Sequence, residues 1–599
     1  MSPDNPKSAE QSMPRGRTRR RSRMLRHLAV GAVAVLAASA GVGALAPSAG
    51  AAPTVGIRVD AGTSLGTVPS SGFGLNTGFG DEHMGDAKVT SLMKAAGVRQ
   101  LRYPGGSGAD DYHWKTHTSG DGKGWIPSNT DFDHFMATAK KVGAQPILTA
   151  NYGSGTAKEA ADWVKYANVD KGYGVKYWEI GNEVYGNGHY GDGKGWETDN
   201  HADKSPKEYG KNLVAYSKAM KAVDPKVKIG AVLTTPGFWP DKERAPGDTA
   251  DWNNTVLSIA GRSIDFVIVH WYPGGTTTDD LLNTPSQIAG VRSSLRSLIA
   301  KYAGSNAASV EIAVTETDGV GSPALTSQAA ALFAPDTYMT WFEQGATHVD
   351  WWNLHNGTSE APTTVHGQTD YQDGGILSAG TCAGGKCEPR RDTPFPTYWG
   401  IRSLTALAKP GDTMVKSSSR NSSVAVHAVR SGKGLNVMLI NKSPKDAAQV
   451  SLSYAGFTPA AGAVTTVSYA KGATALTTAK RGTAGAQTLP PYSITTLQLK
   501  PASGTASADK PSPAPTPTAA TPVVSALGTT GTRAQAEAEA KAKVGTPVSQ
   551  PTPNGTSGPL ASTGVSSAVT YSAFGGLLVI AAGGMLTLRG RRRRASHGK

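Results

Sequence analysis

Apolar residues between positions 73 and 354 occur in short runs that are separated by longer amphipathic stretches. In one such stretch, Val89, Leu92, Met93 and Ala96 follow the i, i+3, i+4, i+7 spacing of a helix that rests on a sheet. The alternation predicts eight strands with helices between them. These predicted strands are Phe73–Asn76, Val98–Tyr103, Pro146–Asn151, Val175–Ile180, Lys228–Leu233, Phe266–Tyr272, Val310–Thr315 and His348–Leu354.

Eight strand-and-helix units over about 280 residues are typical of a (β/α)8 barrel, so we expect an α/β fold with a TIM barrel over 73–408. A doubly wound open sheet is the structural alternative. Such a sheet has fewer strands and usually a glycine-rich phosphate turn, and the sequence shows no turn of that kind.

The pattern changes to period two from Val424 onwards, with Gly, Asn, Ser and Pro between the runs. This alternation predicts a C-terminal all-β sandwich domain over 409–500. The run Val55–Val59, within the N-terminal segment 52–72, is expected to add a strand to it. The other predicted strands are Val424–Val429, Leu435–Ile440, Val450–Tyr454, Val464–Tyr469 and Ile494–Leu499.

The first 51 residues have the order of a secretory signal. A basic stretch, Arg15–Arg26, precedes an apolar run, Leu28–Leu45, and the small-residue site Ala49–Ala51. We therefore expect signal peptidase to cut near Ala52. The pair Arg20-Arg21 is also a feature of twin-arginine export, but the residues after it fit general secretion better.

The other end has the features of a wall anchor. Residues 501–559 are rich in Pro, Ala, Thr and Ser and are expected to form a disordered linker. Within 560–599, the pentapeptide Leu-Ala-Ser-Thr-Gly precedes an uncharged stretch, Val565–Leu588, that is long enough to cross a bilayer, and a basic tail follows. This order resembles an LAxTG-type sortase sorting signal of actinobacteria. The resemblance implies that sortase cuts between Thr563 and Gly564 and joins Thr563 covalently to peptidoglycan; a retained membrane anchor is the alternative.

The net charge of +15 is concentrated in these two ends. Residues 1–51 carry 8 basic and 2 acidic side chains and residues 565–599 carry 6 basic and none acidic, so 12 of the 15 charges lie there. The remaining chain has no electrostatic signature of a nucleic-acid partner.

The sequence contains two cysteines, Cys382 and Cys387. In an oxidising space outside the cell, the expected state is a short local disulfide. A zinc site would need two more ligands at suitable spacing, and none lies nearby, so no metal is expected.

Two predicted strands end in a glutamate. Glu183 follows the run Trp178–Ile180, and Glu316 ends the run Ile312–Glu316. Catalytic groups in such barrels emerge at the C-terminal strand ends, so both should face one mouth. Two carboxyl groups about 5–5.5 Å apart are the requirement for retaining glycoside hydrolysis. Glu179 lies deeper and is expected to pair with a basic group.

Other polar and aromatic side chains also fall at strand ends. An arginine or tyrosine beside a carboxylate keeps it ionised and able to attack, whereas the acid needs a raised pKa. This logic assigns Glu316 as the nucleophile and Glu183 as the acid/base. A packing role stays open for each supporting residue. The candidates for substrate binding at strand ends are Arg102, Tyr103, Asn151, His270, Tyr272 and Trp352.

The Gly-Asn-Glu strand end, the Glu at strand seven and the His-Trp-Tyr at strand six resemble the clan of (β/α)8 retaining glycoside hydrolases. The segments Leu101–Gly106, Tyr112–Trp114, Asn151–Thr156 and Glu159–Val164 are most similar to family 51 α-L-arabinofuranosidases.

By that resemblance, Glu183 is the acid/base, Asn182 holds the sugar hydroxyl next to the reacting carbon, and Glu316 is the nucleophile, positioned by Arg102 and Tyr272. The chain departs from the family at Ser107, where Asn is usual, and in the segments 115–125 and 356–394.

The resemblance implies hydrolysis of terminal α-L-arabinofuranosyl units from a polysaccharide or oligosaccharide, with retention and without a cofactor. Another retaining glycosidase of the clan, acting on a glucuronide, xyloside or galactan, is one alternative. A carbohydrate-binding wall protein that has lost turnover is the other. The expected location is the cell wall at a Gram-positive surface.

Overall fold

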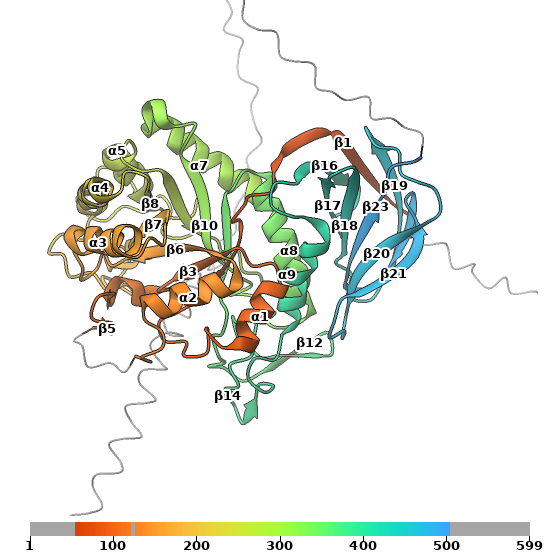
Figure 1. Cartoon of the computed structure of the whole chain (residues 1–599), viewed down its shortest axis with the longest axis horizontal. Coiled ribbons are helices and arrows are strands. Elements are labelled where there is room, and N and C mark those ends of the chain that lie inside the picture. Colours follow the sequence, from red (N-terminus) through yellow and green to blue (C-terminus); the bar gives the residue numbers. More distant parts are fainter. Residues whose placement is uncertain (1–53, 121–125, 504–599) are drawn as a thin grey trace, which may run out of the picture. The chain divides into compact units, whose positions relative to one another are not determined.

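The computed structural model describes residues 54–120 and 126–503 (Figure 1). The signal sequence expected over 1–51 and the sorting signal expected over 560–599, with Thr563 and Gly564, lie outside the described residues, as does nearly all of the linker. Among the helices of the described residues, none combines the length and the apolar character needed to cross a membrane.

Eight parallel strands close into a barrel, which confirms the predicted fold class. Each strand overlaps one of the eight predicted runs, and nearly all of their residues are buried. The strands in barrel order are β2 (Phe73–Asn76), β3 (Gln100–Tyr103), β6 (Gln145–Ala150), β7 (Tyr177–Ile180), β8 (Lys228–Val232), β9 (Phe266–His270), β10 (Glu311–Thr317) and β11 (His348–Trp351), which pairs back with β2.

A helix follows each barrel strand, and several of these helices begin at a capping side chain. Asp131, Ser205 and Asp251 each accept a hydrogen bond from the backbone N–H three residues on, which satisfies a free donor of the first turn. The eight helices are α1 (Ala87–Ala95), α2 (Phe132–Val142), α3 (Ala157–Val164), α4 (Pro206–Val223), α5 (Trp252–Ala260), α7 (Ile288–Tyr302), α8 (Gln328–Glu343) and α9 (Pro396–Leu407). A short helix, α6 (Thr278–Asn283), precedes α7.

The second layer of the molecule is a nine-stranded sheet in the order β21-β20-β23-β18-β17-β16-β1-β19-β22. The N-terminal strand β1 pairs antiparallel with β16 and parallel with β19. The strands are β1 (Val55–Thr67), β16 (Thr413–Ser419), β17 (Val424–Ser431), β18 (Gly434–Asn441), β19 (Ala448–Ala455), β20 (Ala463–Ala470), β21 (Thr477–Thr483), β22 (Ala486–Leu489) and β23 (Ser493–Leu499).

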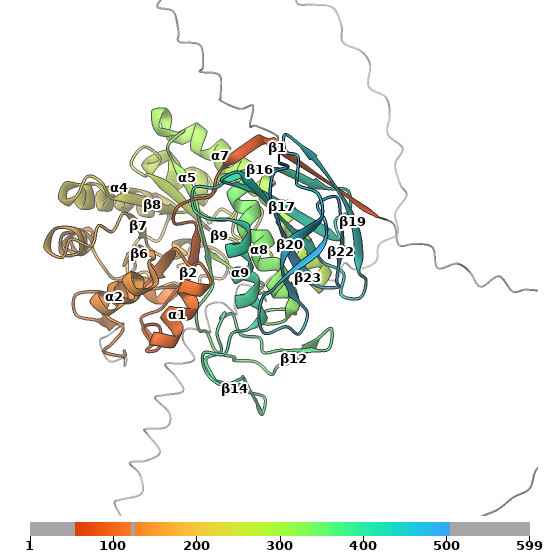
Figure 2. The ribbon, with the colours of Figure 1, turned by 45° about the vertical axis from the view of Figure 1, so that its right-hand side comes forward.

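Alternation along β18 explains how this sheet builds two cores. Val437 and Leu439 point into a core between the strands of the sheet itself, whereas Met438 and Ile440 belong to the core shared with the barrel. Helices α8 and α9 lie on that shared side, against β17, β18, β20 and β23 (Figure 2). Nearly every residue of α8 is buried, because the helix is covered by the barrel on one side and the sheet on the other.

A buried ion cluster also joins the two layers. The imidazole of His427, on β17, lies 3.0 Å from Asp336 and 2.9 Å from Glu343, both on α8. Lys442 lies 2.8 Å from the second oxygen of Asp336. Charges buried at such a junction need all of their partners, because the loss of one side chain leaves the opposite charge buried and unpaired.

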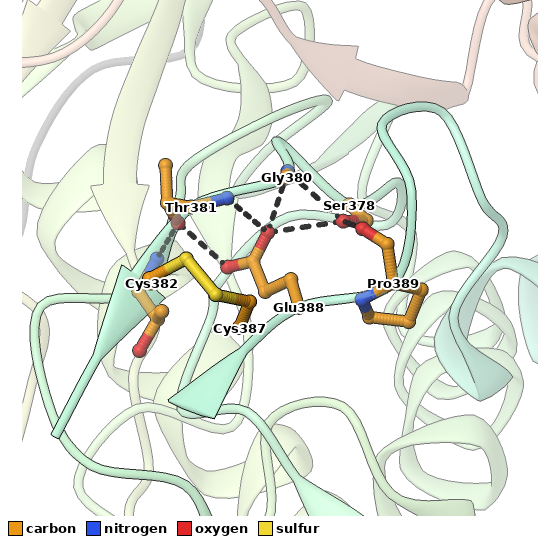
Figure 3. The surroundings of a disulfide bond; sticks show 8 residues. Ser378, Gly380, Thr381, Cys382, Cys387, Glu388 and Pro389 are labelled. Carbon is orange, nitrogen blue, oxygen red and sulfur yellow. Dashed lines mark hydrogen bonds between the residues drawn. A yellow bond between two sulfur atoms is a disulfide. The ribbon is translucent and has the colours of Figure 1, made fainter. Parts of the chain in front are cut away.

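The segment after β11 carries four short strands in two hairpins, and the cysteine pair lies in the second hairpin. Cys382 and Cys387 form the expected disulfide between β14 (Cys382–Ala383) and β15 (Lys386–Cys387) (Figure 3). The carboxylate of Glu388 accepts hydrogen bonds from the Ser378 hydroxyl and from the Gly380 and Thr381 backbone N–H groups. The remaining short strands are β12 (Thr363–Val365), β13 (Gln368–Asp370), β4 (Tyr112–His113) and β5 (Thr118–Ser119).

Candidate active site

The structure brings the two strand-end glutamates together. Glu183 follows β7 with a φ of 35°, a left-handed conformation that costs backbone energy in a residue with a side chain. Glu316 lies near the end of β10. One carboxylate oxygen of each, and a ring nitrogen of His270, lie within 4.8 Å of one another. This spacing fits the approach of about 5–5.5 Å that double displacement needs.

Two donors hold the carboxylate of Glu316. Arg102 Nη1 donates to Oε1 at 2.7 Å, and the Tyr272 hydroxyl donates to Oε2 at 2.7 Å. Burial alone would lower the pKa of Arg102, but the charges of Glu179 and Glu316 raise it above its usual value. Burial and the Glu316 charge raise the pKa of Tyr272, so the phenol keeps the proton that it donates. Both donors place hydrogens on the carboxylate that is expected to attack.

Arg102 also links Glu316 to the floor of the barrel. Its Nε donates to Glu179 Oε2 at 2.7 Å, as expected for the deeper glutamate, and its Nη2 donates to Asn182 Oδ1 at 2.8 Å. Nη1 makes a further hydrogen bond to Asn76 Oδ1 at 3.0 Å. The guanidinium therefore has one orientation, and it fixes both Glu316 and Asn182.

His270 lies between Glu183 and Glu316. Its Nδ1 is 2.9 Å from Glu183 Oε1 and 3.3 Å from Glu316 Oε2. Since both neighbours are acceptors when ionised, Nδ1 must carry a proton to bond either of them. The second oxygen of Glu183 accepts a hydrogen bond of 2.9 Å from Trp196 Nε1.

The pKa of Glu183 differs from the expectation of a raised value. Burial would raise it, but the hydrogen bond and charge of His270, followed by the Trp196 N–H and Tyr185, outweigh burial and lower it. The expectation that the acid needs a raised pKa did not take account of His270 between Glu183 and Glu316. The lowering depends on a protonated His270.

Glu197 is a third buried carboxyl group at the site, and sequence reasoning missed it. Its Oε1 accepts hydrogen bonds from Asn182 Nδ2 at 3.0 Å and from the Ser107 hydroxyl at 2.7 Å. Burial, followed by the charges of Asp110 and Glu183, raises its pKa well above the usual value. Glu197 lies in a glycine-rich loop that has no periodic pattern, so the sequence alone gives no signal for its position.

Asp110 is a buried carboxyl group that holds the backbone next to Glu183. Its carboxylate accepts from the backbone N–H of Tyr152 at 3.0 Å and of Asn182 at 2.8 Å. Burial raises its pKa to about 7 despite these hydrogen bonds, which lower it. Asp110 therefore anchors the backbone just before Glu183.

Two predicted substrate contacts are corrected by the structure. The Tyr103 hydroxyl donates to the Thr130 carbonyl at 2.7 Å inside the core, and the Asn151 carboxamide closes a turn by accepting from the Ser154 and Gly155 N–H groups. Both side chains serve the scaffold, because their polar atoms are taken by the protein itself. Both follow strands, but neither bonds a catalytic glutamate.

Trp352, predicted to bind substrate, follows β11 and packs against the paired glycines after β3. A Cβ on Gly106 would come within 2.6 Å of the Trp352 ring, so the paired glycines allow the indole to approach the backbone. The neighbouring Trp351 is buried in the core. The segment after β11 contacts Trp352 through Gly374.

Glu183, His270 and Glu316 also have the spacing of a metal site. Their ligand atoms, however, already serve other partners, with Arg102 and Tyr272 on Glu316 and Trp196 on Glu183. A cation placed there would face the buried guanidinium of Arg102 across the same carboxylate, which opposes binding.

Known proteins with similar sequences match the chain in part, and no family model matches it. The probable alpha-L-arabinofuranosidase C of Aspergillus fumigatus is 29% identical over 179 residues, which cover 25% of this chain and 32% of that protein. An intracellular exo-alpha-(1->5)-L-arabinofuranosidase of Halalkalibacterium halodurans is 28% identical over 251 residues, or 37% of this chain and 45% of that protein. The chain thus spans less than half the length of these relatives.

Solved structures match over a much larger part of the chain. The α-L-arabinofuranosidase of Thermotoga maritima, in complex with arabinose, has a TM-score of 0.58 at 20% identity and covers 74% of this chain and 99% of its own. The GH51 enzyme of Thermotoga petrophila has a TM-score of 0.57 at 20% identity, covering 75% and 100%. A family 44 xyloglucanase of Paenibacillus polymyxa has a TM-score of 0.56 at 15% identity, covering 75% and 100%. By its fold, the chain is a (β/α)8 barrel with a β-sandwich of the kind seen in these glycoside hydrolases.

Proposed function

We propose that this chain is a retaining α-L-arabinofuranosidase. The observation that carries the proposal is the pair formed by Glu183 and Glu316, with Arg102 and Tyr272 both donating to Glu316. One carboxylate is thus held ionised for attack, and the other faces it at the distance that a covalent glycosyl intermediate requires.

In the first step, a Glu316 oxygen attacks the anomeric carbon and forms an ester bond. The bond between that carbon and the leaving oxygen breaks, and the proton of the Glu183 carboxyl group goes to the leaving oxygen. Asn182, with Oδ1 held by Arg102 and one N–H by Glu197, has its second N–H free to bind the hydroxyl next to the reacting carbon.

In the second step, water attacks the same carbon and the ester bond to Glu316 breaks. Glu183, now a carboxylate, takes a proton from the water as it attacks. The products are free sugar and free alcohol, and both glutamates return to their starting states. Two inversions at one carbon give net retention.

Glu183 must hold a proton for the first step, and His270 controls this. When His270 is a cation, its charge lowers the pKa of Glu183. When the imidazole is neutral, that charge is lost, and burial favours the protonated carboxyl group. The first step therefore requires a protonated Glu183 and an ionised Glu316.

The substrate assignment is supported by two features. The segments around Arg102 and Asn151 resemble family 51, and the names of the two sequence relatives above are those of arabinofuranosidases. The barrel alone does not select a sugar, since a xyloglucanase has the same fold.

A panel of nitrophenyl glycosides tests this proposal. We expect release of nitrophenol from the α-L-arabinofuranoside, and Glu316→Ala is expected to abolish it. Glu360→Ala, on an exposed stretch of the segment after β11, is the matched control that keeps it. Activity on a xyloside, galactoside or glucuronide with none on the arabinofuranoside would overturn the sugar assignment. Unchanged turnover in Glu316→Ala would overturn the site.

We also propose that the enzyme is exported and attached to peptidoglycan through Thr563. The support is the order of pentapeptide, apolar stretch and basic tail in the sequence. Fractionation of cells that express the native chain or Thr563→Ala tests it. Wall-bound protein should be lost in the variant, and equal wall binding in both would contradict sortase attachment.

A further inference from the structure

Trp239 is an exposed aromatic side chain beside the catalytic pair. Among the described residues, it is one of three large hydrophobic residues that are exposed, with 39% of its surface accessible. The other two, Val169 and Ile259, are aliphatic. Trp239 contacts Trp196, with the ring centroids 5.6 Å apart and the planes at 45°. The exposed part of this indole is open to a ligand.

Trp196 joins this exposed ring to the acid/base. Its Nε1 donates to Glu183 Oε2, whereas Glu183 Oε1 faces His270 and, through it, Glu316. The sugar under attack lies between the two glutamates. The leaving oxygen takes its proton from Glu183, so the ring attached to that oxygen extends away from Glu316, towards the side where Trp196 lies.

The two indoles come from different loops that are fixed to each other. His189, in the loop after Glu183, lies 2.9 Å from Asp248, in the loop between β8 and α5 that also carries Trp239. Gly186 allows Trp196 to lie flat on the first loop, because a Cβ there would come within 2.2 Å of the indole. The Trp196–Trp239 wall is therefore a built surface.

We propose that the Trp196–Trp239 wall binds the leaving group, by packing against the sugar ring joined to the arabinofuranosyl unit. Sugar rings present apolar C–H faces, and an indole face buries them while their hydroxyls stay in water. The ligand class is the pentose ring of an arabinan or arabinoxylan chain. This inference rests on the proposed arabinofuranosidase activity and adds the recognition of the chain that is released.

Two substrates that share the arabinofuranosyl unit separate this role from catalysis. The leaving group of α-(1→5)-arabinobiose is a sugar. The leaving group of α-L-arabinofuranosyl fluoride is a fluoride ion, which has no ring to pack against an indole. For Trp239→Ala we expect kcat/KM on the disaccharide to fall about tenfold, mostly through KM, and kcat/KM on the fluoride to stay within twofold. Trp239→Phe should restore most of the loss, and Val169→Ala, at a remote exposed site, should behave like the native enzyme on both substrates.

Equal losses on the two substrates in Trp239→Ala would overturn the inference, because the indole would then act on the site as a whole. No loss on the disaccharide would overturn it as well. Failure of the native enzyme to release arabinose from either substrate would instead overturn the arabinofuranosidase proposal, and the inference with it.

Discussion

Arg102 organises the site at the scale of single residues. It donates to Glu179, Glu316 and Asn182 from one buried guanidinium, so the nucleophile and the amide that is expected to hold the sugar share one support. A lysine has one donor group on a flexible stem and could not make these contacts together. The Leu-Arg-Tyr strand end thus sets the orientation of the Glu179 and Glu316 carboxylates.

The role of Glu183 as acid and base predicts a split between substrates. Glu183→Gln should lower kcat on arabinobiose about 10²–10⁴-fold, because the leaving oxygen receives no proton. On arabinofuranosyl fluoride, which needs little acid assistance, it should release a burst of fluoride equal to the enzyme concentration and then turn over slowly. Glu360→Gln is the control. Equal losses on both substrates, without a burst, would show that Glu183 is not the acid/base.

Glu197 should act through Asn182 and not through its charge. Glu197→Ala removes the acceptor for Asn182 Nδ2 and for Ser107, and should lower kcat/KM about tenfold and the free energy of unfolding by about 1–3 kcal/mol. Glu197→Gln keeps an acceptor oxygen and should restore most of the activity. Steady-state kinetics at several pH values check this. A Gln variant as impaired as the Ala variant would show that the carboxyl group itself takes part.

At the scale of elements, the loops between strands and helices carry structural features of the site that the strands lack. The segment 377–393 is held by its disulfide and by Glu388, whose carboxylate meets Ser378, Gly380 and Thr381 (Figure 3). This segment follows Gly374, which contacts Trp352. The ordering of the segment therefore affects the position of Trp352.

Removal of the Glu388 carboxylate should loosen this segment. Glu388→Ala removes the acceptor of the Ser378 hydroxyl and of the part-buried Gly380 and Thr381 N–H groups, which costs about 1–3 kcal/mol in the free energy of unfolding. Thermal unfolding and the rate of proteolytic cleavage within 377–393 measure the effect. Glu360→Ala, exposed in the same part of the chain, should leave both unchanged. Equal cleavage of native and Glu388→Ala protein would contradict the account.

Strands with a buried face could be predicted from the sequence, and strands without one could not. All eight barrel strands were predicted, because a barrel buries each of them on both faces. Strand β21, Thr-Thr-Ala-Lys-Arg-Gly-Thr, is exposed along most of its length at the edge of the sheet, so no apolar alternation marks it. Strands β16 and β22 were missed for a similar reason, since few of their residues are apolar and buried.

The residues of the candidate site also divide into those that could be predicted from the sequence and those that could not. Glu183, Glu316, Arg102 and Tyr272 lie at or just after strand ends, and their positions were predicted because a barrel gathers strand ends at one mouth. Glu197, Trp196 and Trp239 lie on long loops, where only tertiary contacts decide which side chains return to the site. Tyr103 and Asn151 also follow strands but turn to local partners, which spacing alone cannot reveal.

At the scale of the whole molecule, the barrel and sandwich are joined by the His427 cluster. Burial alone would lower the pKa of His427, but Glu343 and Asp336 raise it to about 10. Burial would raise the pKa of Asp336, yet Lys442 and His427 lower it below its usual value. The folded protein therefore binds the His427 proton more tightly than the unfolded chain does.

This linkage predicts a loss of stability in alkali. The stabilisation by His427 is complete below about pH 6.5, the unfolded value, and is lost as pH rises to about 10. His427→Gln should lower Tm by about 4 °C or more at pH 6 and flatten the decline between pH 6.5 and 10. His134→Gln, an exposed histidine, is the control. Parallel Tm profiles for native and His427→Gln protein would contradict the assignment.

The central claim is that Glu183 and Glu316 act on one anomeric carbon by double displacement. Proton NMR of the arabinose anomers in the first minutes of hydrolysis of an aryl α-L-arabinofuranoside tests it most directly, before mutarotation mixes them. Double displacement predicts that the α anomer forms first. First appearance of the β anomer would show a single inversion by water and would contradict the account.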